Sequence, residues 1–265
     1  MASLADERTA LVRAEPGSLP RHDDFSVGRR AFSVLSIATA VGLLAGNIFR
    51  LCSTGKLFAW WAPLAVVGGM SAADFLSGIV HWAADTWGSE SMPLLGRRLL
   101  HPFRVHHVNP DDFLRRRFVD TNGDVAFLVV PILVAARVLP LDGVVCSVAA
   151  VFLTSFCAIG LLTNQVHQWA HRPRPPRLVR ILQDWRVILD RSAHRQHHAP
   201  PHATNYCIAT GWCNRPLAAI GFFRRLERAV TFVTGLQPRA DEATFRSKNE
   251  PALRPSGEHA GRHDA

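Results

Sequence analysis

Long stretches of this 265-residue sequence lack charge. Residues 32–49 and 143–166 contain no charged side chain, and residues 57–80 contain a single acidic one. Each stretch approaches or exceeds the roughly 20 residues that cross the hydrocarbon core of a bilayer, so we expect three membrane-spanning helices. Residues 125–141 are shorter and carry Arg137 near their end, where a long side chain can reach the headgroups, and we count them as a fourth span.

Motifs of several other protein classes are absent. The sequence contains no CxxC pair, zinc-finger pattern or helix-turn-helix pattern, although its net charge is +9. The basic residues lie beside the apolar stretches, where anionic headgroups explain them, so we expect no nucleic-acid partner. The first 28 residues are polar, and the apolar stretch after them has no small-residue cleavage site. The first span is therefore predicted to be retained rather than removed as part of a signal peptide.

Basic residues also indicate the orientation in the membrane. They precede the first span, gather between the second and third, and follow the fourth, whereas the opposite loops hold little beyond Arg50 and Lys56. Because Lys and Arg accumulate on the cytoplasmic side of short loops, we expect both termini in the cytoplasm. The eleven histidines from His22 to His202 then share one side of the membrane. The Ala- and Arg-rich composition favours a bacterial cytoplasmic membrane.

The predicted fold is an all-α integral membrane protein with about four transmembrane helices and a cytoplasmic histidine-rich helical cap. Residues 1–28 and 236–265 are rich in charge, Pro, Gly and Ser and are predicted to be disordered, which leaves residues 29–235 as the membrane domain. Residues 177–190 predict an interfacial helix, and residues 216–223 a second contact with the membrane surface. The apolar stripe of the interfacial helix comprises Leu178, Leu182, Trp185 and Leu189.

The histidines recur at helical spacings. His167 and His171 are four residues apart, and His194, His197 and His198 follow steps of three and one. Side chains three or four residues apart on a helix have Cβ atoms about 5–6 Å apart on one face, so each set can chelate a metal ion.

Two further segments add candidate ligands. In the second span Asp74, His81 and Asp85 follow steps of seven and four and form one stripe that leads out of the membrane. An acidic residue inside a span is a functional candidate because burying it unpaired is costly, although Asp74 near the interface could simply be hydrated. The segment HPFRVHH, residues 101–107, supplies three more histidines.

This donor set restricts the metal. Imidazole and carboxylate without thiolate suit iron, zinc, copper or nickel better than magnesium or calcium, and the absence of HExxH argues against a common zinc protease. A catalytic zinc needs only three protein ligands, whereas eight or nine candidates indicate two metal ions. A lone histidine is more often a hydrogen-bonded or exposed residue, which is how we interpret His22, His259 and His263 in the tails.

Six segments of the sequence match a known family in order along the chain. They are DFLSGIVHWAADTWGS (74–89), PFRVHHVNP (102–110), DTNGD (120–124), TNQVHQWAH (163–171), LQDWRVIL (182–189) and HRQHHAPPHATNYCIATGW (194–212). These segments resemble the plasmanylethanolamine desaturase (Kua/CarF-like) family of lipid desaturases. The family resembles other membrane desaturases in using histidine boxes for a di-iron centre. Its best-known activity converts an alkyl ether lipid into the vinyl ether of a plasmalogen, and a plant branch desaturates an acyl chain of phosphatidylglycerol.

The resemblance implies a set of site residues. Two histidine boxes and three further family positions give the catalytic histidines, which are His81, His106, His107, His167, His171, His194, His197 and His198. Asp85 and His202 join them as metal ligands, although His202 follows a Pro-Pro break and could instead support a ligand. Asp74, Asp85 and Asn205 could orient imidazoles through the second ring nitrogen. His101 departs from the family, where a basic residue such as Arg is expected, and we leave it out.

The resemblance also implies cofactors and partners. These are two iron ions, O2 as co-substrate and a membrane phospholipid substrate, because oxidation of an unactivated C–H bond requires a cofactor. No GxGxxG or CxxCH motif appears, so the electrons must come from an external ferredoxin or cytochrome b5-like donor, which the basic surface would attract. The oligomeric state is unknown from sequence.

Three alternatives to this function remain open. The same scaffold could desaturate or hydroxylate an acyl chain, which only the reaction products distinguish. A non-enzymatic membrane metal- or haem-binding protein would place polar ligands at midplane in several spans. A zinc hydrolase would hold one metal ion and need neither O2 nor a reductant.

Overall fold

The computed structural model describes residue 21 and residues 26–199 and 202–239, and these form helices and loops without a strand. Four helices are long and apolar enough to cross a membrane, which confirms the predicted all-α fold with four spans. They are α2 (Val27–Ser53), α3 (Ala62–Thr86), α6 (Phe118–Val138) and α7 (Val144–His171). Helix α2 begins inside the range 1–28 that was predicted to be a disordered tail, and most of that range, like residues 240–265, lies outside the described residues.

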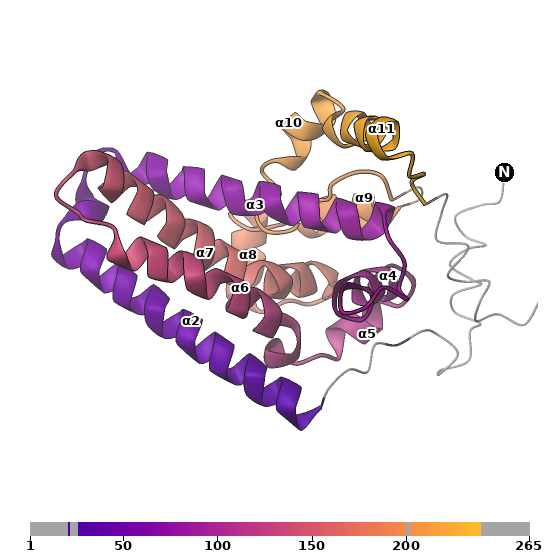
Figure 1. Cartoon of the computed structure of the whole chain (residues 1–265), viewed down its shortest axis with the longest axis horizontal. Coiled ribbons are helices and arrows are strands. Elements are labelled where there is room, and N and C mark those ends of the chain that lie inside the picture. Colours follow the sequence, from indigo (N-terminus) through magenta and orange to yellow (C-terminus); the bar gives the residue numbers. More distant parts are fainter. Residues whose placement is uncertain (1–20, 22–25, 200–201, 240–265) are drawn as a thin grey trace, which may run out of the picture.

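The four long helices pack in the order α2, α6, α7, α3 (Figure 1). Helices α3 and α6 both pack against α7 but scarcely touch each other. The chain runs up and down, so α2 and α6 begin at the same end of the bundle at which α3 and α7 finish. A 3-10 turn, η1 (Lys56–Phe58), and the short connection at residues 139–143 close the opposite end.

Small residues allow the spans to approach closely. A Cβ atom on Gly69 of α3 would collide with the Phe152 carbonyl of α7, and one on Gly123 of α6 would collide with Ser33 of α2. Small side chains at such crossings let helix backbones pack in a membrane. At the far end, the Arg50 guanidinium donates to the carbonyls of Arg137 (2.8 Å) and Leu139 (2.7 Å), which α6 leaves without helical partners.

Shorter helices form a cap at the end where α3 and α7 finish (Figure 1). They are η2 (Gly96–Leu100), α4 (His101–Val108), α5 (Pro110–Leu114), α8 (Arg177–Asp184), α9 (Arg191–His197), α10 (Asn214–Ala219) and α11 (Phe222–Thr234). The last described residue also lies here, because Arg239 N donates to the Thr86 carbonyl at 3.0 Å. Residues 216–223 run from α10 into α11, and their contact with the membrane surface remains a prediction.

The helix predicted over residues 177–190 is too long. Helix α8 ends at Asp184, Arg186 adopts a φ of 56°, and the chain turns back. Trp185 therefore stays exposed, while Leu189 is fully buried and its N–H donates to the Ala209 carbonyl at 3.0 Å. The predicted single apolar stripe is wrong, because a left-handed residue separates its two halves.

Candidate metal centre

Nine metal-binding side chains converge where the cap meets α3 and α7. Helices α3, α4 and α7 each contribute two, and α9 with the residue that follows it contributes three. They form two groups, and within each group one candidate ligand atom per residue lies within 4.8 Å of the others. The five-histidine group comprises His106, His167, His171, His194 and His198. The Asp85 group comprises His81, Asp85, His107 and His197.

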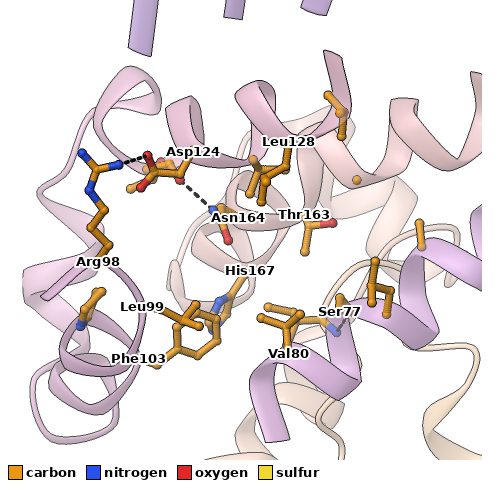
Figure 2. Close-up of a pocket in the computed structure, with 18 of the residues that line it drawn as sticks. Ser77, Val80, Arg98, Leu99, Phe103, Asp124, Leu128, Thr163, Asn164 and His167 are labelled. Carbon is orange, nitrogen blue, oxygen red and sulfur yellow. Dashed lines mark hydrogen bonds and ion pairs between the residues drawn. The ribbon is translucent and has the colours of Figure 1, made fainter. Parts of the chain in front are cut away.

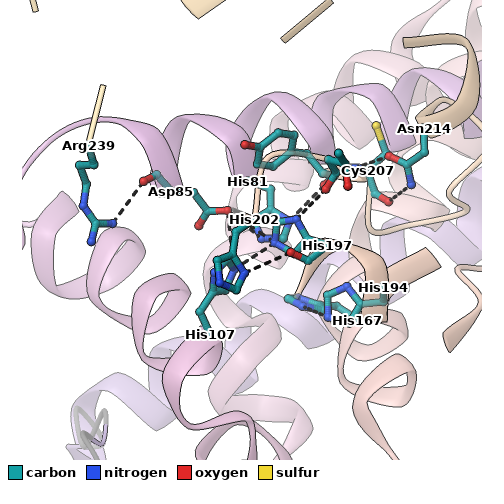
Figure 3. Close-up of polar contacts among 12 residues, drawn as sticks. His81, Asp85, His107, His167, His194, His197, His202, Cys207, Asn214 and Arg239 are labelled. Atoms are coloured by element: carbon teal, nitrogen blue, oxygen red, sulfur yellow. Dashed lines mark hydrogen bonds and ion pairs between the residues drawn. The ribbon is translucent and has the colours of Figure 1, made fainter. Parts of the chain in front are cut away.

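The two groups are adjacent. The rings of His106 and His107, consecutive on α4, have centroids 4.4 Å apart and belong to different groups. The rings of His81 and His167 are 5.6 Å apart across the same boundary. Figure 3 shows His81, His107 and His197 directed toward Asp85, with His167 and His194 beside them. The sequence-predicted boxes therefore meet in one place, as two neighbouring ligand sets.

The distances within the groups fit a bound metal ion. In the five-histidine group the Nε2 atom of His194 lies 3.1 Å from that of His167 and 2.7 Å from that of His171. In the Asp85 group the Nε2 atoms of His197 and His107 are 3.0 Å apart. Two nitrogens bound about 2.0–2.1 Å from one ion at tetrahedral or octahedral angles are themselves about 2.8–3.4 Å apart. The separations of 3.0 and 3.1 Å lie in this range, and the separation of 2.7 Å lies just below it.

Buried polar atoms support the same interpretation. The Nε2 atoms of His106 and His198 are buried and have no hydrogen-bond partner among the described residues. Native proteins rarely leave buried donors or acceptors unsatisfied, so these two nitrogens are suited to bind an ion. Asp85 Oδ2 lies 3.3 Å from His81 Nε2 and 3.6 Å from His107 Nε2. This carboxylate is the one negative charge in either group.

Burial favours the neutral form of four imidazoles of the cap. Burial lowers the pKa of His197 to about 3 and holds the pKa values of His106, His107 and His194 well below their ordinary range, with neighbouring histidines adding to the effect. Metal ligation requires the neutral form of imidazole, so these groups keep the lone pairs that an ion needs.

Backbone carbonyls orient two members of the Asp85 group. His197 Nδ1 lies 2.8 Å from the Thr204 carbonyl, and His81 Nδ1 lies 3.1 Å from the Tyr206 carbonyl. A carbonyl oxygen only accepts, so each Nδ1 carries the proton and donates, which leaves Nε2 as the lone-pair atom inside the group. The segment from Thr204 to Tyr206 is therefore part of the site, and it acts through the carbonyls of Thr204 and Tyr206, whose side chains the sequence analysis did not single out.

Asp74 has a different partner from the one predicted. This fully buried carboxylate was expected to orient an imidazole, but its described contacts are with backbone N–H groups of the segment 209–213. Oδ1 accepts from Ala209, Thr210 and Gly211, and Oδ2 accepts from Cys213. Asp74 anchors the loop that presents the Tyr206 carbonyl, and this role explains an acidic residue within a span.

Asn205 also supports backbone rather than an imidazole. Its Nδ2 donates to the Ala193 carbonyl at 3.2 Å and to Gln196 Oε1 at 3.0 Å, so it ties the loop to α9. Its φ of 55° is a left-handed conformation that Asn tolerates better than most residues. The predicted contact with a ligand ring is absent from the contacts described for this side chain.

His202 and His101 lie outside both groups. The His202 ring is 5.1 Å from that of His107, and its Nδ1 is 3.2 Å from the His197 carbonyl, a supporting position. His101 Nδ1 lies 2.8 Å from Glu90 Oε2, and this hydrogen bond raises the pKa of His101. His101, which the sequence analysis left out of the predicted ligands, thus lies apart from the converging histidines.

A cavity of about 310 Å³ adjoins the five-histidine group (Figure 2). His106 and His167 line it, so these two residues face both the metal-binding group and the cavity. Figure 2 shows the Arg98–Asp124 ion pair on one side and Ser77 with Val80 on the other, with His167 between them. A molecule in the cavity would touch the group directly.

Comparison with known proteins identifies the family. A model for the lipid desaturase domain matches residues 70–241. The chain is 41% identical over 218 residues to plasmanylethanolamine desaturase of Myxococcus xanthus, covering 82% of this chain and 78% of that protein. It is 42% identical over 243 residues to plasmanylethanolamine desaturase 1 of the mouse, covering 84% and 85%. The chain belongs to the lipid desaturase family.

A plant relative is more distant. Fatty acid desaturase 4 of Arabidopsis thaliana chloroplasts is 36% identical over 214 residues, which are 78% of this chain and 61% of that protein. No solved structure matches the chain. Membership of the lipid desaturase family confirms the prediction of a membrane oxidoreductase, and the carrier and hydrolase alternatives fall away.

Two residues of this lipid desaturase that the sequence did not single out position α4 and α5. Buried Gln168 donates from Nε2 to the carbonyls of Phe113 (2.7 Å) and Arg116 (3.0 Å), which fixes the end of α5 on α7. Buried Arg104 donates to the carbonyls of Trp87 (2.8 Å) and Gly88 (3.0 Å), which fixes α4 beside the end of α3. Gln168 lies beside His167, and that was the only available signal.

Proposed function

We propose that this lipid desaturase is an O2-dependent di-iron enzyme that converts a plasmanyl (alkyl ether) phospholipid into the plasmenyl (vinyl ether) form. The observation that carries the proposal is the pair of adjacent ligand groups at the ends of spanning helices. Two relatives that match most of the chain are named plasmanylethanolamine desaturases. Bound iron would supply the activation of O2 that no side chain provides.

The reaction balances as a two-electron oxidation of the lipid. Adjacent carbons of the alkyl chain each lose one hydrogen, and a double bond forms between them beside the ether oxygen. O2 takes the two electrons and two protons released from the lipid, together with two electrons from an external donor and two protons from water, and leaves as two water molecules. The protein would hold the imidazole ligands of the cap in their neutral form, orient Nε2 atoms and keep the lipid beside His106 and His167.

The depth of the site suits an ether substrate. The first carbon of an alkyl ether lies at headgroup level, and the two groups lie at the ends of α3 and α7, not at their midpoints. We propose that this end faces the cytoplasm, because the loops at the other end carry few basic residues. Exposed Arg177, Arg180 and Arg224 on the cap would attract an acidic ferredoxin or cytochrome b5-like donor.

The Arabidopsis relative favours a second candidate reaction. Its name is fatty acid desaturase, so desaturation of a phospholipid acyl chain on the same scaffold is the alternative. It would use the same ligand groups and the same donor. Only the chemical position of the new double bond separates the two reactions.

Lipid mass spectrometry tests the proposal. Cells without plasmalogens are fed an alkylglycerol and express the chain or its His197→Ala variant. We expect an acid-labile vinyl ether lipid, two mass units below its alkyl precursor, with the intact chain alone. New double bonds confined to acyl chains would favour the alternative, and an unchanged lipid profile with folded, iron-loaded protein and donor would contradict both.

A further inference from the structure

The cavity beside the five-histidine group changes polarity along its length. On α7 its lining is a single helical stripe that passes from His167 through Asn164 and Thr163 to Gly160 and Phe156. Apart from the adjacent pair Thr163 and Asn164, neighbouring members of this stripe are three or four residues apart, so they share one face of the helix. The stripe changes from imidazole to amide and hydroxyl, and then to purely apolar groups deeper in the span.

Helix α6 shows the same gradient on the facing wall. Its lining begins with Asp120 and Asp124 near the cap and continues with Leu128, Val129 and Ile132 farther into the span. Because α6 starts at the end where α7 finishes, the two gradients run in the same spatial direction. The cavity therefore has one charged end at headgroup level and one apolar end inside the bilayer.

The cavity opens toward the hydrocarbon between α3 and α6. Leu76 and Val80 of α3 and Leu128 of α6 line it, and they are nevertheless 47%, 37% and 65% exposed. The two helices that carry them scarcely touch each other. A membrane lipid could thus move in sideways without passing through water.

The depth of the cavity matches one leaflet. Its α7 stripe runs from residue 167 to residue 156, about 16 Å at 1.5 Å per residue. Half of a hydrocarbon core of about 30 Å is about 15 Å. A lipid chain that starts beside His167 therefore reaches close to the midplane at Phe156.

The charged end offers both signs of charge. Arg29 and Arg98 both contact Asp124, at 3.0 Å and 3.4 Å, and all three line the cavity. The side chains of Arg98 and Asp124 are 41% and 37% exposed, and such partly solvated ion pairs contribute little stability. The Arg29 side chain is only 12% exposed, so a phosphate would replace Asp124 most readily on Arg98, with Arg29 beside it, and an ammonium could bind the carboxylate.

We infer that this cavity binds the glycerophospholipid substrate, with its phosphate at Arg29 and Arg98, its first chain carbons against His106 and His167, and its chain buried toward Gly160. This inference rests on the proposed function and names the place of the substrate in it. It also makes Gly160 the residue that determines which chain length fits.

Gly160 is suited to this role because its missing side chain leaves space in the cavity. A Cβ atom there would meet only Val129 Cγ1, at an ordinary 3.8 Å. At Gly69 and Gly123, by contrast, any larger side chain would collide with a neighbouring span. A leucine at position 160 would project into the apolar half of the cavity, about 10 Å from the level of His167 at 1.5 Å per residue.

The test compares chain-length preference in the intact chain, Gly160→Leu and a control. The control is Gly42→Leu, since Gly42 lies within span α2, is exposed, and would meet nothing within 4 Å of an added Cβ. Cells receive octyl, dodecyl and hexadecyl glycerols together, since the shortest chain ends near the level of residue 160 and the other two pass it, and both the vinyl ether products and the ether lipids that co-purify with the protein are measured. Ratios between chain lengths cancel differences in the amount of folded protein.

In Gly160→Leu we expect the hexadecyl to octyl ratio to fall more than about tenfold in both measurements, because each excluded methylene weakens binding about fourfold and a hexadecyl chain loses several. Gly42→Leu should match the intact chain. If Gly160→Leu does not fold, Gly160→Ala should shift the ratio less and in the same direction. Unchanged ratios in a folded variant would overturn the inference. Absence of vinyl ether from the intact chain would contradict the proposed function instead, while the retained lipids still test the cavity.

Discussion

The two ligand groups lie side by side but differ in charge. The five-histidine group contains only imidazoles, and two of its members line the cavity. The Asp85 group contains a carboxylate whose Oδ2 lies 3.3–3.6 Å from three imidazole Nε2 atoms, those of His81, His107 and His197. An ion bound beside Asp85 would be partly neutralised, whereas an ion bound beside the cavity would keep more of its positive charge and would face the proposed lipid. We therefore expect the Asp85 group to hold its ion more tightly and the five-histidine group to contact the substrate.

The groups also differ in what supports them. Backbone carbonyls of Thr204 and Tyr206 orient two imidazoles of the Asp85 group, and Asp74 anchors the loop that carries the second carbonyl. In the five-histidine group His167 and His171 belong to the continuous helix α7 and meet His194 directly. Disturbing the loop should therefore affect the Asp85 group first.

Removing one ligand from either group should have the largest effect. We expect His171→Ala and His197→Ala each to lower desaturation by more than about a hundredfold, because loss of even an outer partner of a ligand can cost that much. Vinyl ether formation in cells measures the loss. His101→Ala, which changes a histidine paired with Glu90, should retain most activity. Full activity in either ligand variant would remove that residue from the site.

Removing the negative charge of Asp85 should affect metal binding in one group and not in the other. Asp85→Asn keeps the shape but removes the negative charge, so we expect purified protein to lose one of two metal ions and about a hundredfold in activity. Metal analysis per folded chain measures the loss, with Asp184→Asn, an exposed carboxylate at the end of α8, as the control. Equal loss of both ions would mean that the groups bind as one unit.

Weakening the loop anchor should have an intermediate effect. The two carboxylate oxygens of Asp74 accept from four N–H groups, and Asp74→Asn replaces one of these oxygens by an amide nitrogen that cannot accept. The Tyr206 carbonyl therefore loses its fixed position. We expect about a tenfold lower iron affinity in the Asp85 group, with the five-histidine group unchanged and activity restored by added iron. Iron titration followed by activity checks this. Equal weakening of both groups would contradict the local role of the loop.

The smallest effect is expected at Asn205. Asn205→Ala removes two hydrogen bonds and places a less tolerant residue at positive φ, which should lower the free energy of unfolding by about 1–2 kcal/mol. Asn205→Gly, which tolerates that φ, should lose less. Thermal unfolding of the iron-loaded protein measures both. A large loss of activity in Asn205→Gly would indicate a direct contact with a ligand that the geometry does not contain.

The spans and the histidine spacings could be predicted from sequence because both are local patterns. Uncharged runs of about 20 residues set the spans, and helical steps set which imidazoles share a face. The pairing of α4 with α9, which joins His107 to His197 across 90 residues, came only from the structure.

The contacts that support the candidate ligands could not be predicted from the sequence, for two physical reasons. Asp74 binds N–H groups more than 130 residues away, and Thr204 and Tyr206 act through carbonyls, which every residue has. A buried acid in a span was a correct signal of a special role, but it did not identify the partner. The single left-handed residue Arg186 likewise broke a stripe that periodicity alone made continuous.

We propose that the two neighbouring groups hold a pair of iron ions. Metal analysis combined with Mössbauer spectroscopy of the purified protein in lipid tests it most directly. We predict two irons per chain that are magnetically coupled, and loss of the coupling in Asp85→Asn while one iron remains. A single metal ion per folded, active chain, or two uncoupled ions, would contradict the account.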